Sequence, residues 1–414
     1  MNCSQEKVLI VQYAGDYRNA VNRFENGGEE TYYAQKYSVD AVAKLKAEIE
    51  GIDEVATLCC LTQDSYNEVL SNGVRAIGTG FAPKIQPRKL LNLVADYNPT
   101  VLILRTPNQQ ILKWAIRNKK QTLVILADSF ETKGLRRKIY NYQLARLLNH
   151  PQISWVGNHG VNAARSLMGI GVNPDKIIPW DWPHQVTPHT LASKSLDLDP
   201  EIWHILYVGA VKDAKGIGDA IEALAYLRNK GLSVQLKVAV KGDLDRFSRQ
   251  AKGLGIEQYV EFLGLVPNKT IIPRMREADL VIVPSRHEYP EGFPMTIYET
   301  LCSRTPMVAS DHPMFLDKLK NRMNALVFPA SNPLALAQCI EELLSNPTLY
   351  QTLSAASCKT WDSLQIPVRW GDFVQSWLAD SSEHKEWLFQ NRFSSSQYAN
   401  PPELKSIGYS LQEA

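Results

Sequence analysis

Two glutamates and the loop between them are the part of this sequence best suited to chemistry. Glu291 and Glu299 stand eight positions apart in the run EGFPMTIYE, just after an apolar stretch at 280–283 that reads as a buried strand. Gly292 permits an open backbone conformation, and Pro294 suits the first position of a helix because its missing N–H costs nothing there. The run therefore predicts a loop that leads from a strand into a helix.

The start of this predicted helix is suited to an anion, because unpaired N–H groups and the positive end of the helix dipole attract phosphate. Glu291 would lie in the loop beside that anion and Glu299 one turn inside the helix. Both carboxylates would repel a phosphate, so they make sense only if they bind hydroxyl groups. The pattern therefore favours a nucleotide sugar, which carries both phosphate and hydroxyls. The alternative is an exposed loop acid and an acid on a helix face.

A second motif, VGAVKDAKGIGDAIEAL, begins at residue 208 and places Lys212 and Lys215 in a loop between a predicted strand and a predicted helix. A lysine beside a helix start is a phosphate contact, and the following glycines let the backbone approach a ligand. The alternative is an ordinary surface turn. The run 216–221 lacks the third glycine of a dinucleotide site, and no Walker-type loop is present, which disfavours a nicotinamide-dependent oxidoreductase.

Short, nearly continuous apolar runs separated by helical patterns must position these residues. Such runs are typical of parallel strands covered on both faces. The predicted fold is α/β, with two doubly wound Rossmann-like domains facing a cleft. The predicted strands lie at 7–13, 55–61, 100–105, 122–128 and 153–158 in the first half, and at 204–210, 234–240, 259–264, 280–285, 306–310 and 325–329 in the second. In the first half, a polar segment is expected to reach Glu30, followed by a helix from near Glu29 to about Glu50.

A proline-rich polar stretch separates the two halves and predicts a linker. The predicted units are a first domain at 1–182, a linker at 183–200, a second domain at 201–366, a returning segment at 367–390 and a polar tail at 391–414. Trp370, Phe373 and Trp377 share one face of the helix predicted after Pro367, so this helix needs an apolar partner, for which the first domain is the candidate.

Composition narrows the class of protein. The 414 residues are 44% hydrophobic and 21% charged with a net charge of +2, which fits a soluble globular protein and argues against a dedicated nucleic-acid binder. The six cysteines lack metal-ligand spacing, so no metal site is expected and a reduced, cytoplasmic setting fits best. Neither a signal peptide nor a membrane span is predicted.

Three passages of the second domain occur in the order and spacing of one family. VGA…KG near 208–216, VEFLGLVPNKTIIPRMREADLVIVPS at 260–285 and EGFPMTIYETLCSRTPMVASD at 291–311 together resemble the retaining glycosyltransferases of family 4, the glycosyl transferases group 1, which have the GT-B fold. The resemblance covers roughly 200–330 well and the first domain only as a pattern.

The resemblance implies a role for each matching residue. Glu299 matches the glutamate that holds the nucleotide ribose, Glu291 the one beside the donor sugar at the reacting centre, and Lys215 the lysine that neutralises the departing diphosphate. In this fold, side chains and a helix dipole supply the positive charge without a metal. The backbone N–H groups expected to complete the anion site are those of Gly292, Phe293, Met295 and Thr296.

This sequence departs from the family at three positions. Ala210 stands where members have an arginine, so one diphosphate cation is missing, and Lys212 is a hypothetical replacement. Asp128 stands after a first-domain strand where many members have a histidine near the sugar; it could contact a sugar hydroxyl or equally cap the next helix. Pro294 replaces a glycine and removes one amide donor.

Two further loops of the first domain are candidates. Members often have a glycine pair close to the donor phosphates and the acceptor, and Gly27–Gly28 stands in such a place, although a flexible loop explains it as well. Asn158 and His159 could line the cleft or form a polar cap.

The stretch 135–150 combines Arg136, Arg137 and Lys138 with apolar residues. Such a helix can lie on anionic lipid, which would suit a lipid-linked acceptor at the inner membrane face, but a solvated helix face is the alternative.

The sequence therefore predicts a cytoplasmic glycosyltransferase of the kind used in polysaccharide biosynthesis. It would move a sugar from a UDP-, GDP- or ADP-linked donor to a glycan, lipid-linked or small acceptor, with retention of configuration and without a further cofactor. The alternative is a degenerate, non-catalytic relative that binds a sugar, a nucleotide or a partner. The base, the sugar, the acceptor and the oligomeric state stay open, because they depend on variable loops.

Overall fold

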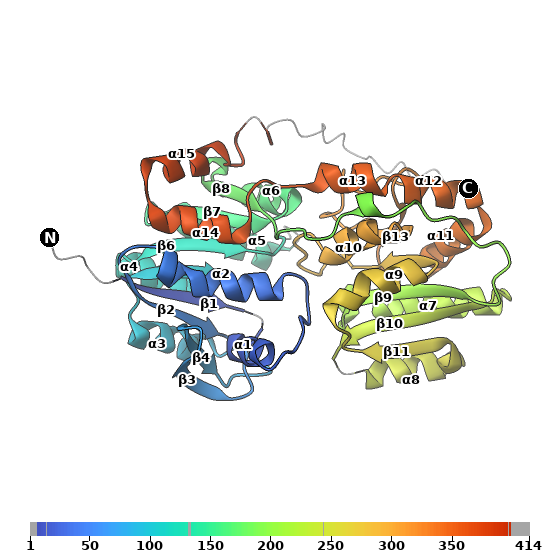
Figure 1. Cartoon of the computed structure of the whole chain (residues 1–414), viewed down its shortest axis with the longest axis horizontal. Coiled ribbons are helices and arrows are strands. Elements are labelled where there is room, and N and C mark those ends of the chain that lie inside the picture. The colour runs from blue at the N-terminus through green and yellow to red at the C-terminus, as the bar shows by residue number, and fades with distance from the viewer. Residues whose placement is uncertain (1–5, 14, 131–133, 243, 396, 399–414) are drawn as a thin grey trace.

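Apolar runs of both halves form two separate, mainly parallel sheets. The computed structural model describes residues 6–13, 15–130, 134–242, 244–395 and 397–398. In this part of the chain the two sheets and their helices form two α/β domains that lie side by side (Figure 1). The predicted fold, two Rossmann-like domains in the GT-B arrangement, is confirmed.

The first sheet has the order β3-β4-β2-β1-β5-β6-β7-β8, and only the edge strand β3 is antiparallel to its neighbour. Its strands are β1 (Glu6–Gln12), β2 (Ile52–Cys59), β3 (Ser65–Val69), β4 (Arg75–Thr79), β5 (Val101–Arg105), β6 (Gln121–Leu126), β7 (Ile153–His159) and β8 (Ile177–Trp180).

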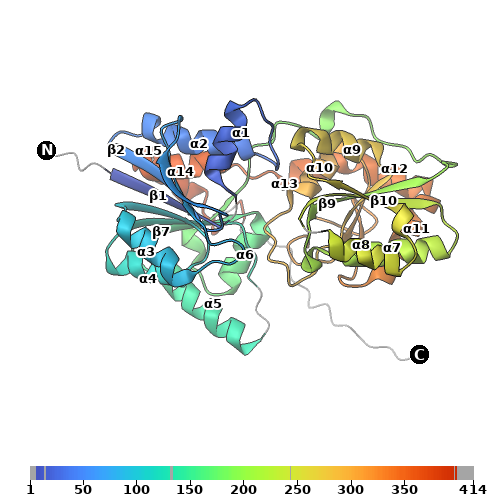
Figure 2. The same cartoon turned by 90° about the horizontal axis from the view of Figure 1, so that it is seen from below.

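Helices cover both faces of the first sheet, as Figure 2 shows from below. Because side chains alternate along a strand, Val8 and Ile10 pack on one face and Leu9 and Val11 on the other. The first face is covered by α1 (Tyr17–Glu25), α2 (Gln35–Glu48), α14 (Trp370–Ala379) and α15 (Ser382–Gln390). The second face is covered by α3 (Pro87–Tyr97), α4 (Gln109–Arg117), α5 (Leu135–Leu148) and α6 (Val161–Gly169).

The second sheet is parallel throughout, in the order β11-β10-β9-β12-β13-β14. Its strands are β9 (Trp203–Ala210), β10 (Val234–Lys241), β11 (Val260–Gly264), β12 (Leu280–Val283), β13 (Met307–Ser310) and β14 (Leu326–Phe328). Its helices are α7 (Ile217–Asn229), α8 (Asp245–Gly253), α9 (Ile271–Glu277), α10 (Met295–Ser303), α11 (Pro333–Ser345), α12 (Pro347–Ala355) and α13 (Ser357–Leu364).

The chain returns to the first domain after α13. Trp370, Phe373 and Trp377 of α14 are buried in the core of the first sheet, beside residues of β1 and α2. The predicted crossing of a C-terminal helix back to the first domain is thus confirmed, and its three aromatic residues supply the reason.

The segment before α2 differs from the expectation. Instead of an irregular polar stretch, α1 forms at Tyr17–Glu25, with Asp16 as its N-cap accepting a hydrogen bond from the Asn19 N–H at 3.0 Å. The expected helix begins at Gln35 rather than near Glu29, because Ala34 adopts a left-handed conformation just before it.

The end of the chain is also packed further than expected. Phe393, inside the predicted polar tail, is buried in the first domain, and its N–H donates to the Ile177 carbonyl at 2.7 Å. The remainder of that tail, 399–414, lies outside the described residues.

Candidate functional site

The start of α10 lies at the interface of the two domains, where the preceding residue Phe293 approaches Gly160 of the first domain. Pro294 is the N-cap residue and Met295 the first helical residue, one position later than predicted. The Thr296 hydroxyl donates to the Val208 carbonyl of β9 at 3.4 Å and so seats the first turn against the centre of the second sheet. The N–H groups of a first helical turn have no partner within the helix, which leaves them for a ligand.

Glu291 lies at the centre of a buried polar cluster. One carboxylate oxygen forms an ion pair with the Lys215 ammonium and accepts a 2.7 Å hydrogen bond from the Ser285 hydroxyl. The Glu291 side chain is 7% exposed and the Lys215 side chain 15%, so solvent screens this pair little. The structure therefore brings together two of the predicted residues, and it adds Ser285, which sequence reasoning did not single out.

The turn that carries Lys215 is held firmly. Gly216 has a φ of 76°, and a Cβ at this position would overlap the Pro284 carbonyl, so only glycine fits. Arg286 binds both carboxylate oxygens of the buried Asp219, at 2.8 and 2.5 Å, and its N–H donates to the Ala214 carbonyl. These contacts join the lysine turn to the loop that leads to Glu291.

Tyr289 connects both lysines of that turn. The Lys215 and Lys212 ammonium groups lie 4.5 and 5.6 Å from the centre of its ring, within the range of cation–π attraction. Burial raises the pKa of Tyr289 to about 12, and the charges of Glu291 and Asp128 contribute in the same direction. Lys212 therefore shares the site of Lys215, whereas Ala210 contributes no charge. Tyr289 was not identified from the sequence, because its role depends on this placement.

Asp128 follows β6 on the first-domain side. Burial raises the pKa of its carboxyl group to about 6. The next helix, α5, begins at Leu135 with Gly134 as its N-cap, so the helix-capping interpretation of Asp128 is wrong. The side chain of Asn158 donates to the Asp128 and Ala163 carbonyls at 2.8 and 2.9 Å, which makes Asn158 a buried polar cap.

Glu299 lies one turn inside α10, where the sequence placed it. Its carboxylate is buried and accepts a 2.7 Å hydrogen bond from the Asn268 side chain. Burial raises the pKa of Glu299 to about 7, and the Asn268 contact offsets this only in part. The Asn268 N–H donates to the Glu30 carbonyl at 3.0 Å, so this residue links Glu299 to the first domain.

The glycine pair Gly27–Gly28 lies on the Glu299 side of the interface. The following residue, Glu29, forms an ion pair with Lys269 of the second domain. Gly28 lines a cavity of about 910 Å³ between α2, α14, the linker and α9, and neither Glu291 nor Lys215 lines it. The described contacts thus place the glycine pair near Asn268 and do not bring it to Lys215.

The two domains touch directly at the start of the Glu291 loop. A Cβ on Gly292 would lie 2.9 Å from the Ala127 carbonyl oxygen and 3.2 Å from His159 Nδ1, both of the first domain. Phe293 packs against Gly160 in the same interface. Glycine at 292 is required by this close approach rather than by an open backbone.

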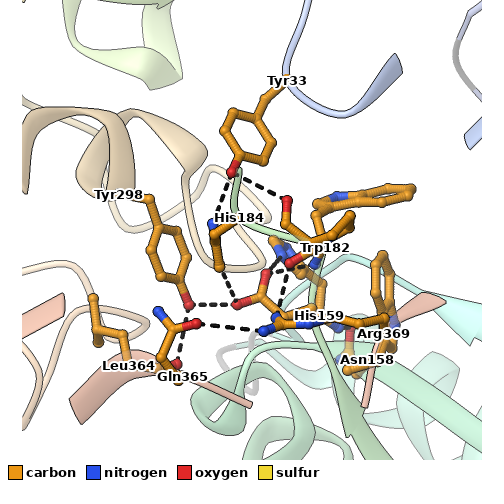
Figure 3. Close-up of polar contacts among 12 residues, drawn as sticks. Tyr33, Asn158, His159, Trp182, His184, Tyr298, Leu364, Gln365 and Arg369 are labelled. Carbon is orange, nitrogen blue, oxygen red and sulfur yellow. Dashed lines mark hydrogen bonds and ion pairs between the residues drawn. The ribbon is translucent and has the colours of Figure 1, made fainter. Parts of the chain in front are cut away.

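A second polar cluster lies at the hinge, where β8 leaves the first domain (Figure 3). Its centre is the fully buried Asp181, surrounded by His159, His184 and Tyr298. The run WDWPH at 180–184 contains the acid and two of its donors, Trp182 and His184, but nothing in that run indicates His159 or Tyr298.

Two negative findings concern the described part of the chain. No group of three or more His, Cys, Asp or Glu side chains within it could hold a metal ion. None of its helices has the length and apolar character needed to cross a bilayer.

The geometry combines two ammonium groups and an open helix start with two buried carboxylates, one in the loop after β12 and one inside α10. Such a site suits an anion with hydroxyl groups attached, held where two Rossmann-like domains meet. Fold and site together define a protein of the GT-B fold class, with a candidate anion site where its two domains meet.

Comparison with known proteins matches part of the chain to a family model. Residues 190–360, in the linker and the second domain, match the model of the glycosyl transferases group 1. The chain is 28% identical over 284 residues to the phosphatidyl-myo-inositol mannosyltransferase of Mycobacterium leprae, which covers 67% of this chain and 73% of that protein. Matches to several further glycosyltransferases cover less than half of those proteins.

Solved structures show the same fold at low sequence identity. Sucrose-phosphate synthase from Thermosynechococcus elongatus superposes with a TM-score of 0.61 at 17% identity, over 87% of this chain and 94% of that one. HepE from Anabaena, in complex with UDP-glucose, superposes with a TM-score of 0.59 at 13% identity, over 92% of this chain and 99% of that one.

Proposed function

We propose that this protein transfers a glycosyl group from a nucleotide sugar to an acceptor hydroxyl, with retention of anomeric configuration and without a metal. The observation that carries the proposal is the buried Lys215–Glu291–Ser285 cluster beside the open start of α10, with Glu299 one turn further along the same helix.

Each part of the donor finds a complementary group. The diphosphate would lie against the first turn of α10, where the N–H groups of Gly292, Phe293, Met295 and Thr296 are the predicted donors. The ribose hydroxyls would donate to Glu299, with Asn268 at its side (2.7 Å from the carboxylate).

During transfer, the bond between the anomeric carbon and the diphosphate oxygen breaks, and its electron pair stays on the diphosphate. Lys215 stabilises this charge, and Lys212 supplies the cation that Ala210 lacks. The acceptor oxygen bonds to the anomeric carbon on the face that the diphosphate leaves, and it loses its proton. In this proposal Glu291 stabilises the positive charge that develops on the sugar, and the Asp128 carboxylate takes the proton that the acceptor hydroxyl loses.

The ion pair between Lys215 and Glu291 keeps the lysine in place before the donor binds. A bound diphosphate would compete with Glu291 for the same ammonium. Before the donor binds, Glu291 therefore neutralises the charge of Lys215. When the diphosphate is bound, the Lys215 ammonium is available to stabilise the negative charge of the leaving group.

Uridine diphosphate sugars are the first donors to test, because HepE, which shares the fold, binds UDP-glucose. A thermal-shift panel of UDP-, GDP- and ADP-sugars identifies the base, since a bound ligand raises the melting temperature by mass action. Glu299→Ala should then weaken donor binding at least tenfold in calorimetry, about the value of a lost charged hydrogen bond. Glu257→Ala, an exposed acid of the same domain, is the matched control.

Two outcomes would contradict the proposal. If no nucleotide sugar raises the melting temperature of the wild type, the donor assignment fails. If a donor binds but neither hydrolysis nor transfer releases the nucleotide over many hours, the protein is the non-catalytic binder that Ala210 suggested as the alternative.

A lipid-linked acceptor is the second part of the proposal. On α5, Leu135, Ile139 and Tyr142 are 76%, 50% and 62% exposed, beside the basic residues at 136–138. The relative from Mycobacterium leprae is named for a phosphatidyl-myo-inositol acceptor, which supports a membrane surface for this helix. The double change Leu135→Ser and Ile139→Ser should abolish co-sedimentation with phosphatidylglycerol vesicles. Unchanged sedimentation would leave α5 as a solvated face.

A further inference from the structure

The buried carboxylate of Asp181 stands where the chain passes from one domain to the other. It follows β8, and its N–H donates to the Val368 carbonyl at 2.9 Å while its own carbonyl accepts from the Trp370 N–H at 3.2 Å. The outgoing and returning segments are therefore joined at this residue. No contact of Asp181 reaches the proposed substrates, so its charge needs another explanation.

Four donors surround the two carboxylate oxygens. His159 Nε2 and the Trp182 N–H donate to Oδ1 at 2.9 and 2.7 Å, and His184 Nε2 and the Tyr298 hydroxyl donate to Oδ2 at 3.1 and 2.6 Å. Burial alone would raise the pKa of Asp181, but the hydrogen bonds from His159 and His184 outweigh it and hold the pKa well below the usual range. Asp181 is thus an ionised acceptor, and its donors come from both domains.

One donor belongs to the helix of the proposed ribose site. Tyr298 precedes Glu299 on α10, so the two side chains leave the helix about 100° apart. Tyr298 points to the hinge, where its ring lies 4.2 Å from that of His184, while Glu299 points to Asn268. Fixing Tyr298 therefore fixes the rotation of α10 about its axis, and with it the direction of Glu299.

A second donor supports the loop of Glu291. His159 binds Asp181 through Nε2, and its Nδ1 and carbonyl lie where they limit the approach of Gly292. Phe293, the next residue, packs edge-on against Tyr298 with ring centres 5.3 Å apart. The same carboxylate thus supports the helix of Glu299 and the turn after Glu291.

The hinge cluster also reaches the loop of the glycine pair. The Tyr33 hydroxyl lies 2.8 Å from His184 Nδ1 and 3.2 Å from the Pro183 carbonyl. Arg369, on the returning segment, donates to the Trp182 carbonyl at 2.9 Å. The loop of the glycine pair and the returning segment are therefore each tied to Asp181 through one neighbouring residue, His184 or Trp182.

We propose that Asp181 is a positioning residue for the donor site: through Tyr298 it sets the orientation of Glu299, and through His159 it holds the Glu291 loop against the first domain. This inference rests on the proposed function, because it takes the ribose as the ligand of Glu299. It adds that the geometry of the donor site depends on the closed hinge.

Tyr298→Phe is the principal test, because it removes one hydroxyl from Asp181 and keeps the ring contacts with His184 and Phe293. The nucleotide diphosphate found by the panel should bind about tenfold more weakly, as expected when a hydrogen bond to a charged group is lost. KM for the donor should rise accordingly, whereas kcat at saturating donor should change much less.

Tyr350→Phe is the matched control for a purely structural effect. Tyr350 is also buried in the second domain, and its hydroxyl donates to the Asp279 carbonyl at 2.7 Å, away from the site. It should lower the free energy of unfolding without changing nucleotide affinity. Equal affinity losses in the two variants would show a general loss of stability and overturn the proposal.

A double-mutant cycle separates positioning from a direct role. In a Glu299→Gln background, Tyr298→Phe should weaken nucleotide binding much less than in the wild type, because the carboxylate that it orients is gone. Full additivity of the two changes would overturn the proposal. Should Tyr298→Phe fold poorly, His159→Ala and His159→Gln replace it: the glutamine can still donate to Asp181 and should restore most of the affinity that alanine loses.

These results also separate this inference from the proposed function. If the wild type binds no nucleotide diphosphate, the proposed function itself fails. If the wild type binds one and Tyr298→Phe binds it equally well, the donor site stands and the role of Asp181 is refuted.

Discussion

At the scale of single residues, the carboxyl groups in and near the site differ in pKa. Glu299 has a pKa of about 7, raised by burial, and Asp128 a pKa of about 6 for the same reason. Asp181, buried more deeply, is held ionised by its hydrogen bonds. Burial therefore does not decide the charge of an acid; the number of donors aimed at it does.

Donor affinity should depend on pH through Glu299. An ionised carboxylate accepts two ribose hydroxyls, whereas protonation replaces one acceptor with a donor. Protons therefore compete with the donor, and affinity should rise with pH through about 7 and fall by up to roughly tenfold for each pH unit well below it. Calorimetry between about pH 6 and about pH 8.5 measures this. Glu299→Gln should bind more weakly with a flat profile; a flat wild-type profile would contradict the prediction.

The two lysines should differ in their effects. Lys215→Ala removes the cation from the leaving diphosphate and leaves buried Glu291 with Ser285 alone, so kcat should fall by roughly 10²- to 10³-fold. Lys212→Ala should weaken binding of the nucleoside diphosphate about tenfold but leave binding of the free nucleoside unchanged. Lys230→Ala, at the exposed lysine that caps the far end of α7, serves as the control. If Lys212→Ala behaves like this control, Lys212 does not replace the cation missing at Ala210.

At the scale of elements, the strands of the second domain were predicted to within two residues, because buried parallel strands give continuous apolar runs. The exposed edge strand β3 has no such run, and Pro179 interrupts β8, so neither was predicted. Helix α1 was missed although Tyr17, Ala20 and Val21 show the helical period.

The sequence placed Lys215 and Glu291 at the same site, because their two motifs occur in the order and spacing of one family. The Asp181 cluster could not be predicted, because its four donors come from three separate segments: β7, the run after β8, and α10.

The turn between β9 and α7 should tolerate no side chain. Gly216→Ala combines a left-handed φ with an overlap on the Pro284 carbonyl, whereas Gly231→Ala has a similar φ of 88° and nothing within 4 Å. Gly231→Ala should cost about 1 kcal/mol in the free energy of unfolding, and Gly216→Ala at least about 2 kcal/mol more, from the overlap. Urea denaturation of both variants measures the difference. Equal losses would show that the turn relaxes freely.

At the scale of the whole molecule, the contacts between the domains differ in how deeply they are buried. The returning helix α14 and the Asp181 cluster form the hinge, and both are buried. The contacts of Glu29 with Lys269 and of Glu30 with Asn268 join the loop before α2 to the turn before α9. The side chains of Glu29 and Lys269 are exposed. The buried hinge should hold while the loop contacts open, so that the donor enters beside Asn268 and closure completes the pocket.

Gly292→Ala tests closure directly, because its methyl group would press on the Ala127 carbonyl at 2.9 Å and on His159 at 3.2 Å. A contact below about 3 Å forces the first domain to move away, while both domain cores stay intact. The free energy of unfolding should change little, donor affinity and kcat should both fall, and amides near 158–162 and 291–296 should exchange hydrogen faster. Gly253→Ala, at the end of α8 with nothing within 4 Å, should leave donor affinity, kcat and these exchange rates unchanged. A Gly292→Ala variant that binds the donor like the wild type would show that the site forms without the close approach of Gly292 to the first domain.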